Sequence, residues 1–171
     1  HPGSVAPRNR GVVSPALHRT FGGDGTTQGL RGLAALPYVG AGVLGSAIAM
    51  DKEMMKRVCR ERMLPIVDYV TLGSDCLDPV SAAASLGFPL FVKPAAEGSS
   101  MGITSASLCG DETQLNACAS HLLATYDGAV LIEEFLPGAE FTVGIVGNGA
   151  SSRAIGAMQV VPKKPDGHFI Y

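Results

Sequence analysis

The chain has 171 residues, and 46% of them are hydrophobic, so it is long enough and apolar enough to bury a core. Its formal net charge is −2, from 13 basic and 15 acidic residues, and no cationic block occurs. This charge balance shows no basic patch that would bind nucleic acid or an anionic membrane. We therefore expect a protein that acts on small molecules.

The sequence carries no targeting signal that we recognise. No apolar stretch approaches the roughly 18 residues of a membrane-spanning helix, and the start has neither an initiator Met nor a secretory pattern. We therefore expect a cytoplasmic protein whose first residue is not a natural start. The cysteines form no C-x-x-C pair or Cys/His cluster, which favours reduced thiols at Cys59, Cys76, Cys109 and Cys118.

The first quarter of the sequence alternates short apolar pieces with glycine-rich loops. Residues 11–17 predict a short strand that runs into His18, and residues 19–25 predict a loop. A threonine cap predicts a short helix to Leu33, followed by an extended piece over residues 36–40. The predicted order of strand, loop, helix and strand corresponds to half of an α/β unit.

From residue 46 onward the predicted helices and strands follow one another closely. Apolar side chains at three- and four-residue intervals predict a single helix over 46–63. Two further helices are predicted over 78–86 and 111–126, the first opened by Asp78-Pro79. Strands are predicted over residues 67–72, 89–94, 103–108, 129–135, 141–146 and 154–161.

Residues 95–102 form the glycine-serine loop, which joins two of these strands directly after Lys93. Small residues such as Gly98, Ser99 and Ser100 leave backbone N–H groups free to line an anion site. Lys93 could pair with nucleotide phosphates, and the loop could fold over them as a lid. The alternative is a plain hairpin connection, and no Walker phosphate loop occurs.

Acidic side chains stand at the end of the apolar strand over residues 129–135. A carboxylate from Glu133 or Glu134 could accept a hydrogen bond from an adenine amino group, and a further acid, Glu140, could bind both ribose hydroxyls. The alternative is that Glu133 and Glu134 simply alternate at a strand end, with one of them in water.

These motifs occur together in the order found in the D-alanine:D-alanine ligases, which the sequence resembles from about His18 to Tyr171. The central motifs are Met50-Asp51-Lys52, Lys93-Pro94-x-x-Glu97-Gly98-Ser99-Ser100-x-Gly102 and Leu131-Ile132-Glu133-Glu134-Phe135-x-x-Gly138-x-Glu140. Two upstream segments also resemble the family: His18-x-x-x-Gly22-x-Asp24-Gly25-x-x-Gln28-Gly29 and Pro37-Tyr38-Val39-Gly40-x-Gly42.

The resemblance implies an α/β (α+β) protein with a partial ATP-grasp fold. Residues 1–49 would be a remnant of an N-terminal α/β lobe. Residues 50–138 would form a central lobe with a mainly antiparallel sheet and two flanking helices, and residues 139–171 the opening hairpin of a truncated third lobe. Nucleotide would lie between the last two lobes. The hairpin would leave an apolar sheet face uncovered, so we expect poor solubility or self-association.

The resemblance also implies an enzyme that uses ATP to join two D-alanines for peptidoglycan synthesis. ATP would phosphorylate the carboxylate of one D-alanine, and the amine of the second would attack the acyl phosphate. Lysines, backbone N–H groups and Mg²⁺ (or Mn²⁺) would neutralise the transferred phosphoryl group. Two D-alanines and ATP are thus the expected partners, without nucleic acid or membrane, and the parent enzyme could be a homodimer.

Carried over position by position, the resemblance assigns a role to each motif residue. Lys52 and Lys93 would contact phosphate, Glu133 adenine and Glu140 ribose, while the backbone of Leu136 would meet the adenine edge. The full expected nucleotide-binding set is Lys52, Lys93, Gly98, Ser100, Glu133, Glu134, Leu136 and Glu140. The expected catalytic residues are Ser99, which would help to place substrate, and His18, near the first D-alanine. The alternatives are a solvated helix lysine for Lys52 and a core-edge histidine for His18.

The sequence departs from the family in places. The family motif is H-G-x-x-G-E-D-G. At the matching positions this sequence has Arg19 in place of a glycine and Gly23 in place of an acid, and both changes alter geometry and charge at the first-substrate site. The acid that holds the first D-alanine, the Lys-Tyr loop and the metal ligands would all lie outside His1 to Tyr171, so no residue here is assigned to metal. We therefore expect weak nucleotide binding and little or no turnover by this polypeptide alone.

Three alternatives stay open at this point. A D-alanine:D-lactate or D-alanine:D-serine ligase, or another carboxylate-amine ligase, keeps the fold and changes the acceptor. An inactive fragment would bind nucleotide at most. The third alternative is a purely structural domain, which would not explain why the lysines and the acids occur at the spacing found in the family.

Overall fold

The computed structural model describes residues 11–15, 21–76 and 78–161. The helices are α1 (Thr26–Leu33), α2 (Val43–Met50), α3 (Lys52–Glu61), α4 (Pro79–Ala82) and α5 (Glu112–Thr125), with 3₁₀ turns η1 (Ser105–Ser107) and η2 (Gly149–Ser151). The strands are β1 (Tyr69–Leu72), β2 (Leu90–Pro94), β3 (Leu108–Cys109), β4 (Val130–Glu134), β5 (Glu140–Val146) and β6 (Arg153–Val160). No helix in these ranges is long and apolar enough to span a bilayer.

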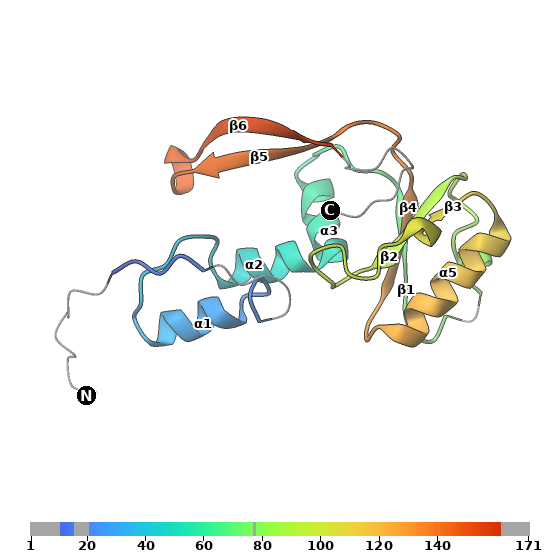
Figure 1. Cartoon of the computed structure of the whole chain (residues 1–171), viewed down its shortest axis with the longest axis horizontal. Helices are drawn as coiled ribbons and strands as arrows, with labels where there is room; N and C mark the ends of the chain where they lie inside the picture. Colours follow the sequence, from blue (N-terminus) through green and yellow to red (C-terminus); the bar gives the residue numbers. More distant parts are fainter. Residues whose placement is uncertain (1–10, 16–20, 77, 162–171) are drawn as a thin grey trace.

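The centre of the fold is an antiparallel four-stranded sheet in the order β1-β4-β2-β3. Side chains alternate between the two faces of a strand, so Leu90 and Val92 of β2 share one face with Val130 and Ile132 of β4. These four side chains are almost fully buried and form one core cluster with Leu115, Ala119 and Leu122 of α5. Helices α4 and α5 therefore cover this face (Figure 1).

The opposite face of the same sheet carries charged side chains beside an aromatic one. Phe91 and Lys93 of β2 and Glu133 of β4 occupy the alternate positions, and α3 lies on this side (Figure 1). One face of the sheet thus builds the core, while the other face positions charged groups.

Asp51 divides the helix predicted over residues 46–63 into two. It has an extended conformation, with φ −87° and ψ 104°, and its carboxylate accepts a hydrogen bond from the Met54 N–H at 3.0 Å. Asp51 is thus the N-cap of α3, and the prediction of one continuous helix was wrong because the apolar periodicity hid this cap. The break frees the Lys52 N–H to bond the Ala95 carbonyl at 2.9 Å.

The prediction of a strand over residues 103–108 was also wrong. Thr104 and Ser107 form reciprocal capping bonds around η1, and only Leu108 and Cys109 pair with β2. Local hydroxyl bonds compete here with the sheet ladder. The helix predicted over 78–86 is likewise only one turn long, although Asp78 caps it as expected.

Nearer the N-terminus, the strand predicted over residues 11–17 reduces to a single parallel bridge between Val13 and Tyr38 in the described residues. The predicted helix to Leu33 is confirmed as α1, but the predicted threonine cap was wrong, because the N-cap is Gly25 and no side chain caps this helix. The other predicted strands are confirmed with ends shifted by one or two residues.

Strands β5 and β6 form a separate antiparallel hairpin, drawn in orange and red in Figure 1. Its side chains are solvent-exposed almost throughout, including Phe141 at 60%, Ile145 at 68% and Met158 at 69%. The hairpin therefore shows large apolar side chains to solvent.

Candidate functional site

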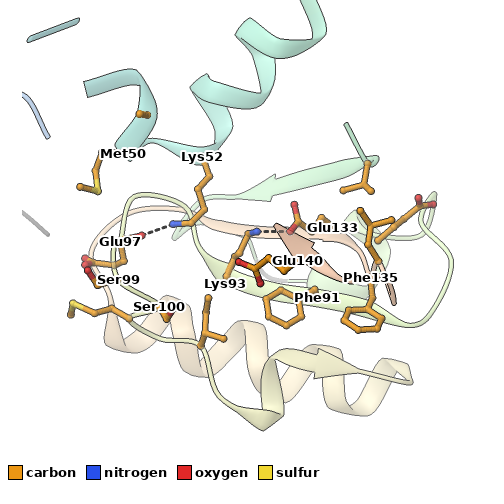
Figure 2. Close-up of a pocket in the computed structure, with 18 of the residues that line it drawn as sticks. Met50, Lys52, Phe91, Lys93, Glu97, Ser99, Ser100, Glu133, Phe135 and Glu140 are labelled. Atoms are coloured by element: carbon orange, nitrogen blue, oxygen red, sulfur yellow. Dashed lines mark hydrogen bonds and ion pairs between the residues drawn. The ribbon is translucent and has the colours of Figure 1, made fainter. Parts of the chain in front are cut away.

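A cavity of about 980 Å³ lies on the face of the central sheet that carries Lys93 and Glu133. It is lined by the start of α3, by β2 and β4, by the glycine-serine loop and by the segment that leads into β5 (Figure 2). All the nucleotide-binding residues expected from the sequence line it, together with Ser99: Lys52, Lys93, Gly98, Ser100, Glu133, Glu134, Leu136 and Glu140. His18 lies outside the described residues.

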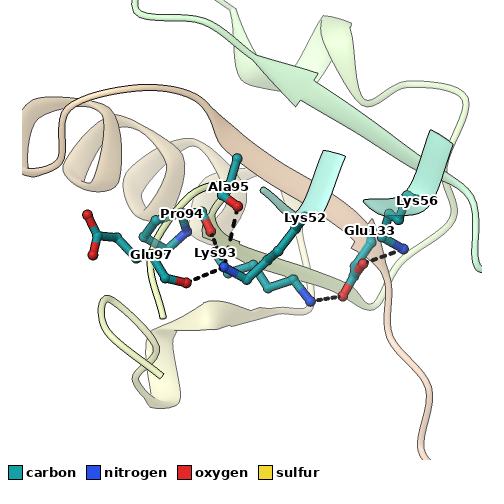
Figure 3. Close-up of polar contacts among 7 residues, drawn as sticks. All are labelled: Lys52, Lys56, Lys93, Pro94, Ala95, Glu97 and Glu133. Carbon is teal, nitrogen blue, oxygen red and sulfur yellow. Dashed lines mark hydrogen bonds and ion pairs between the residues drawn. The ribbon is translucent and has the colours of Figure 1, made fainter. Parts of the chain in front are cut away.

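The floor of this cavity is an ion-pair network centred on Glu133. Lys93 bonds Oε1 of the Glu133 carboxylate, and the Lys56 Nζ lies 2.8 Å from Oε2 (Figure 3). All three side chains are mostly buried, with exposed fractions of 12% for Glu133, 8% for Lys56 and 19% for Lys93. Two cations therefore share one carboxylate, and the network carries a net positive charge.

The two lysines keep Glu133 ionised. Burial alone would raise the pKa of this carboxyl, but the charge of Lys93 and the hydrogen bonds from Lys56 and Lys93 outweigh burial and lower the pKa below its ordinary value. Glu133 thus faces the cavity as a carboxylate, a hydrogen-bond acceptor only.

Lys52 has a different environment from Lys93. Its Nζ donates to three backbone carbonyls at the start of the glycine-serine loop: those of Pro94 at 3.0 Å, Ala95 at 3.4 Å and Glu97 (Figure 3). Burial and then the nearby charge of Lys93 lower the pKa of the Lys52 ammonium. In this structure Lys52 therefore holds the loop, and a direct contact with phosphate would require one of these bonds to open.

The glycine-serine loop has a strained backbone at its tip. Ser99 and Ser100 have φ values of 51° and 57°, and the Met101 N–H donates to the Gly98 carbonyl at 3.1 Å. Two consecutive positive φ angles across such a bond are typical of a type I′ turn, in which glycine or asparagine is usual. The strain is held in place by Lys52 on one side of the turn and Gly102 on the other.

Gly102 is required by its surroundings. Its φ is +77°, and a Cβ at this position would lie 2.6 Å from Cγ of Pro94. Only glycine therefore allows the loop to return against β2 at this point.

The far end of the cavity combines an apolar wall with an acid. The rings of Phe91 and Phe135 stack with centroids 6.3 Å apart, and Leu136 and Val67 also line this part. Glu140, the first residue of β5, contributes its carboxylate (Figure 2). An apolar slot with carboxylates beside it and lysines further along is chemically suited to a planar base joined to an anionic tail.

Comparisons with known proteins agree with this geometry. A family model described as "D-ala D-ala ligase C-terminus" matches residues 41–171. The chain belongs to the D-alanine–D-alanine ligase family. A D-alanine–D-alanine ligase from Solibacter usitatus is 50% identical, covering 95% of this chain and 50% of that protein. One from Bordetella avium is 42% identical, covering 91% of this chain and 47% of that protein.

The structural comparison gives the same family. The D-alanine-D-alanine ligase from Coxiella burnetii has a TM-score of 0.75 and 34% identity, and the match covers 88% of this chain and 42% of that one. The chain thus has the ATP-grasp fold of the D-alanine–D-alanine ligases. It spans about half the length of the curated relatives that it matches.

One residue of the site in this ligase-family chain, Lys56, was missed by sequence reasoning. The sequence motifs assign no role to Lys56, yet it bonds Glu133. Its spacing of four residues from Lys52, one helical turn, was the available signal. Gly23, which replaces a family acid, lines the cavity.

The family also implies magnesium. Among residues 11–15, 21–76 and 78–161, no group of three or more His, Cys, Asp or Glu side chains could hold a metal ion. Glu133, a mostly buried carboxylate of the cavity, is already bonded to two lysines. The described residues therefore do not form a magnesium site.

Proposed function

We propose that this chain carries the ATP-binding part of an ATP-dependent ligase that joins two D-alanines to make D-alanyl-D-alanine for peptidoglycan. The convergence of Lys93, Glu133, Glu140 and the glycine-serine loop on one cavity carries the proposal. These residues come from separate parts of the sequence, and they combine an acceptor for a base with cationic and backbone donors for an anion. The family membership of the chain supports the same reading.

In the proposed complex, the nucleotide extends along the cavity. The base lies in the apolar slot by Phe135, with its amino group donating to Glu133 and its edge at the Leu136 backbone. Glu134 lies beside this acceptor at the strand end. The ribose hydroxyls donate to Glu140. The phosphates reach Lys93 and the N–H groups of the glycine-serine loop, where Gly98 and Ser100 line the cavity.

The proposed reaction has two steps. A carboxylate oxygen of the first D-alanine attacks the terminal phosphorus of ATP, the bond to ADP breaks, and an acyl phosphate forms. The amine of the second D-alanine then attacks the acyl carbon, loses a proton and expels inorganic phosphate. Positive charge from Lys93 and the loop N–H groups would stabilise the transferred phosphoryl group. Magnesium or manganese would accompany ATP with ligands other than the described residues.

The roles of the remaining residues are part of the same proposal. Ser99, at the strained tip of the loop, would help to place substrate, and His18 would lie near the first D-alanine. Lys52 would hold the loop through its carbonyl bonds and meet phosphate once one of them opens. The proposed division is an N-terminal remnant over 1–49, a central lobe over 50–138 and the start of a third lobe over 139–171.

Isothermal titration calorimetry of the full 171-residue chain with ATP, UTP and inorganic triphosphate tests the nucleotide part of the proposal. The expected result is weak binding of ATP that is tighter than binding of UTP or triphosphate, since only ATP offers an adenine amino group to Glu133. Equal binding of all three would reduce the site to a general anion site and contradict the proposal.

The ligase part needs a separate assay. The chain is incubated with ATP, magnesium and D-alanine, and D-alanyl-D-alanine is measured by mass spectrometry against a matched incubation with L-alanine. Formation of a dipeptide from D-alanine only would support the proposed ligase activity. ATP binding with little or no dipeptide is the result expected of the ATP-binding part alone, whereas a dipeptide formed equally well from L-alanine would contradict the proposed D-alanine ligase.

A further inference from the structure

We propose that Lys56 is a positioning residue that keeps Glu133 ionised and aimed at the adenine amino group when Lys93 turns to the phosphates. The inference rests on the proposed function, because it assigns a partner to the carboxylate that would read the base. Lys56 itself would touch neither nucleotide nor substrate.

Lys56 lies behind Glu133. It stands one helical turn after Lys52 in α3, it is 6% exposed, and it does not line the cavity, whereas Lys93 and Glu133 do. Its ammonium contacts Oε2 of Glu133 and lies 5.1 Å from the centre of the Tyr69 ring. Tyr69 is directly opposite Glu133 in the β1–β4 pairing, so the ring and the carboxylate enclose the same ammonium from one strand pair.

The two lysines differ in what a nucleotide would do to them. A phosphate group bound in the cavity competes with Glu133 for the Lys93 ammonium, since both anions need the same donors. When Lys93 turns away, Oε1 becomes available to accept from the adenine amino group. Oε2 stays on Lys56, which is out of reach of the cavity.

Without Lys56, the same exchange would leave a mostly buried carboxylate with no directly bonded cation, since Lys52 is bonded to loop carbonyls. Such a group takes up a proton or swings to solvent, and in either case its acceptor oxygen no longer faces the base. The pairing of one carboxylate with two lysines therefore permits one lysine to leave while the other keeps the acceptor in place.

The prediction concerns base selectivity more than affinity. Inosine triphosphate has a carbonyl oxygen where ATP has the amino group, so a fixed carboxylate at Glu133 disfavours it. The wild-type chain should bind ATP more tightly than inosine triphosphate by about tenfold, the size of one hydrogen bond to a charged group. Lys56→Met should reduce this ratio to about one to threefold, and Lys56→Arg should restore it.

Nuclear magnetic resonance titration of the ¹⁵N-labelled full chain with each nucleotide measures these ratios, even for weak binding. Arg57→Met is the matched control, because it also removes one cation from α3 but from an exposed side chain that pairs with Glu53. It should keep the wild-type ratio. In a Glu133→Gln background, Lys56→Met should change the ratio no further. The amide spectrum of each variant reports whether it is folded.

A second measurement uses only the wild-type chain and so does not depend on a variant that folds. The side-chain ammonium ¹⁵N signals of Lys56 and Lys93 are followed as ATP is added. The signal of Lys93 should shift strongly, while that of Lys56 should stay near its starting position.

The outcomes separate the two proposals. If the wild-type chain binds ATP but Lys56→Met lowers ATP and inosine triphosphate binding equally, Lys56 has only a structural role and the inference is wrong. An ammonium of Lys56 that shifts as much as that of Lys93 also overturns it. If the wild-type chain shows no preference for ATP, the proposed nucleotide site itself is wrong, and the inference is overturned with it.

Discussion

Lys93 and Glu133 lie on neighbouring strands, two positions apart in the β2–β4 register and on the same face of the sheet, where their side chains form an ion pair. Cross-strand diagonals of this kind are within reach of long side chains. The alternation that directs Val92 and Ile132 into the core directs Lys93 and Glu133 to the cavity. The packing of the core thus fixes the spacing of the charged pair.

Removal of Lys93 should weaken nucleotide binding. Lys93→Met takes away a charge-assisted contact to phosphate, so the dissociation constant for ATP should rise by at least about tenfold. Calorimetry measures this constant. Arg62→Met, which removes a cation at the exposed end of α3, should leave it unchanged. Equal losses in the two variants would indicate that only the overall charge of the chain matters.

Glu140 should be recognised by its preference for a ribose hydroxyl. The wild-type chain should bind ATP more tightly than 2′-deoxy-ATP by several-fold, since a carboxylate accepts from the 2′-hydroxyl in the proposed complex. Glu140→Ala should weaken ATP binding more than 2′-deoxy-ATP binding, because 2′-deoxy-ATP has only its 3′-hydroxyl contact to lose. A variant that loses both nucleotides equally would remove Glu140 from the ribose site.

The stability of the chain should depend on pH through Glu133. Because its folded-state pKa is lowered, the folded state binds fewer protons at this site than the unfolded chain does. The stabilisation is therefore present above the ordinary carboxyl pKa and is lost as the pH falls through the folded pKa. Urea midpoints of wild type and Glu133→Gln should differ most near about pH 7, and the difference should shrink as the pH falls below the ordinary carboxyl pKa. A difference that does not vary with pH would contradict this account.

Gly102 should tolerate no side chain. In Gly102→Ala the new Cβ meets the Pro94 ring and the backbone keeps a positive φ, so the free energy of unfolding should fall by about 2–4 kcal/mol. Gly128→Ala is a matched control with φ +105° and open space around its Cβ, and it should cost only about 1 kcal/mol. Urea denaturation compares the two. Equal losses would show that the contact with Pro94 has no energetic effect.

The β5–β6 hairpin should cause self-association. Its exposed apolar side chains include Phe141, Val143 and Ile145. The double variant Val143→Lys/Ile145→Lys should reduce the apparent mass at high concentration, since charged side chains oppose burial in an interface. Light scattering measures this mass. A wild-type chain that stays a monodisperse monomer at the same concentration would contradict the prediction.

The sequence motifs predicted most of the cavity, for a physical reason. Strand alternation places Lys93 and Glu133 on one face, and glycines with serines between strands predict an exposed loop. The residues that converge are far apart in the sequence, and only the family resemblance brought Lys52 and Glu140 into the same site before the structure did.

The parts that sequence reasoning missed depend on tertiary contacts or on local capping. Asp51 ends one helix and caps the next, although the apolar pattern continues through it. Thr104 and Ser107 bond each other in place of a neighbouring strand. The pairing of Lys56 with Glu133 joins residues 77 positions apart through the packing of α3 on the sheet. The helical spacing of Lys56 from Lys52 places it on the same side of α3, but it does not identify Glu133 as the partner.

The most direct test of the account is a crystal structure of the full chain with a non-hydrolysable ATP analogue. The account predicts adenine against Phe135 with its amino group on Glu133, ribose on Glu140 and phosphates at Lys93 and the glycine-serine loop. A nucleotide bound on another surface, with the Lys93–Glu133 pair undisturbed, would contradict it.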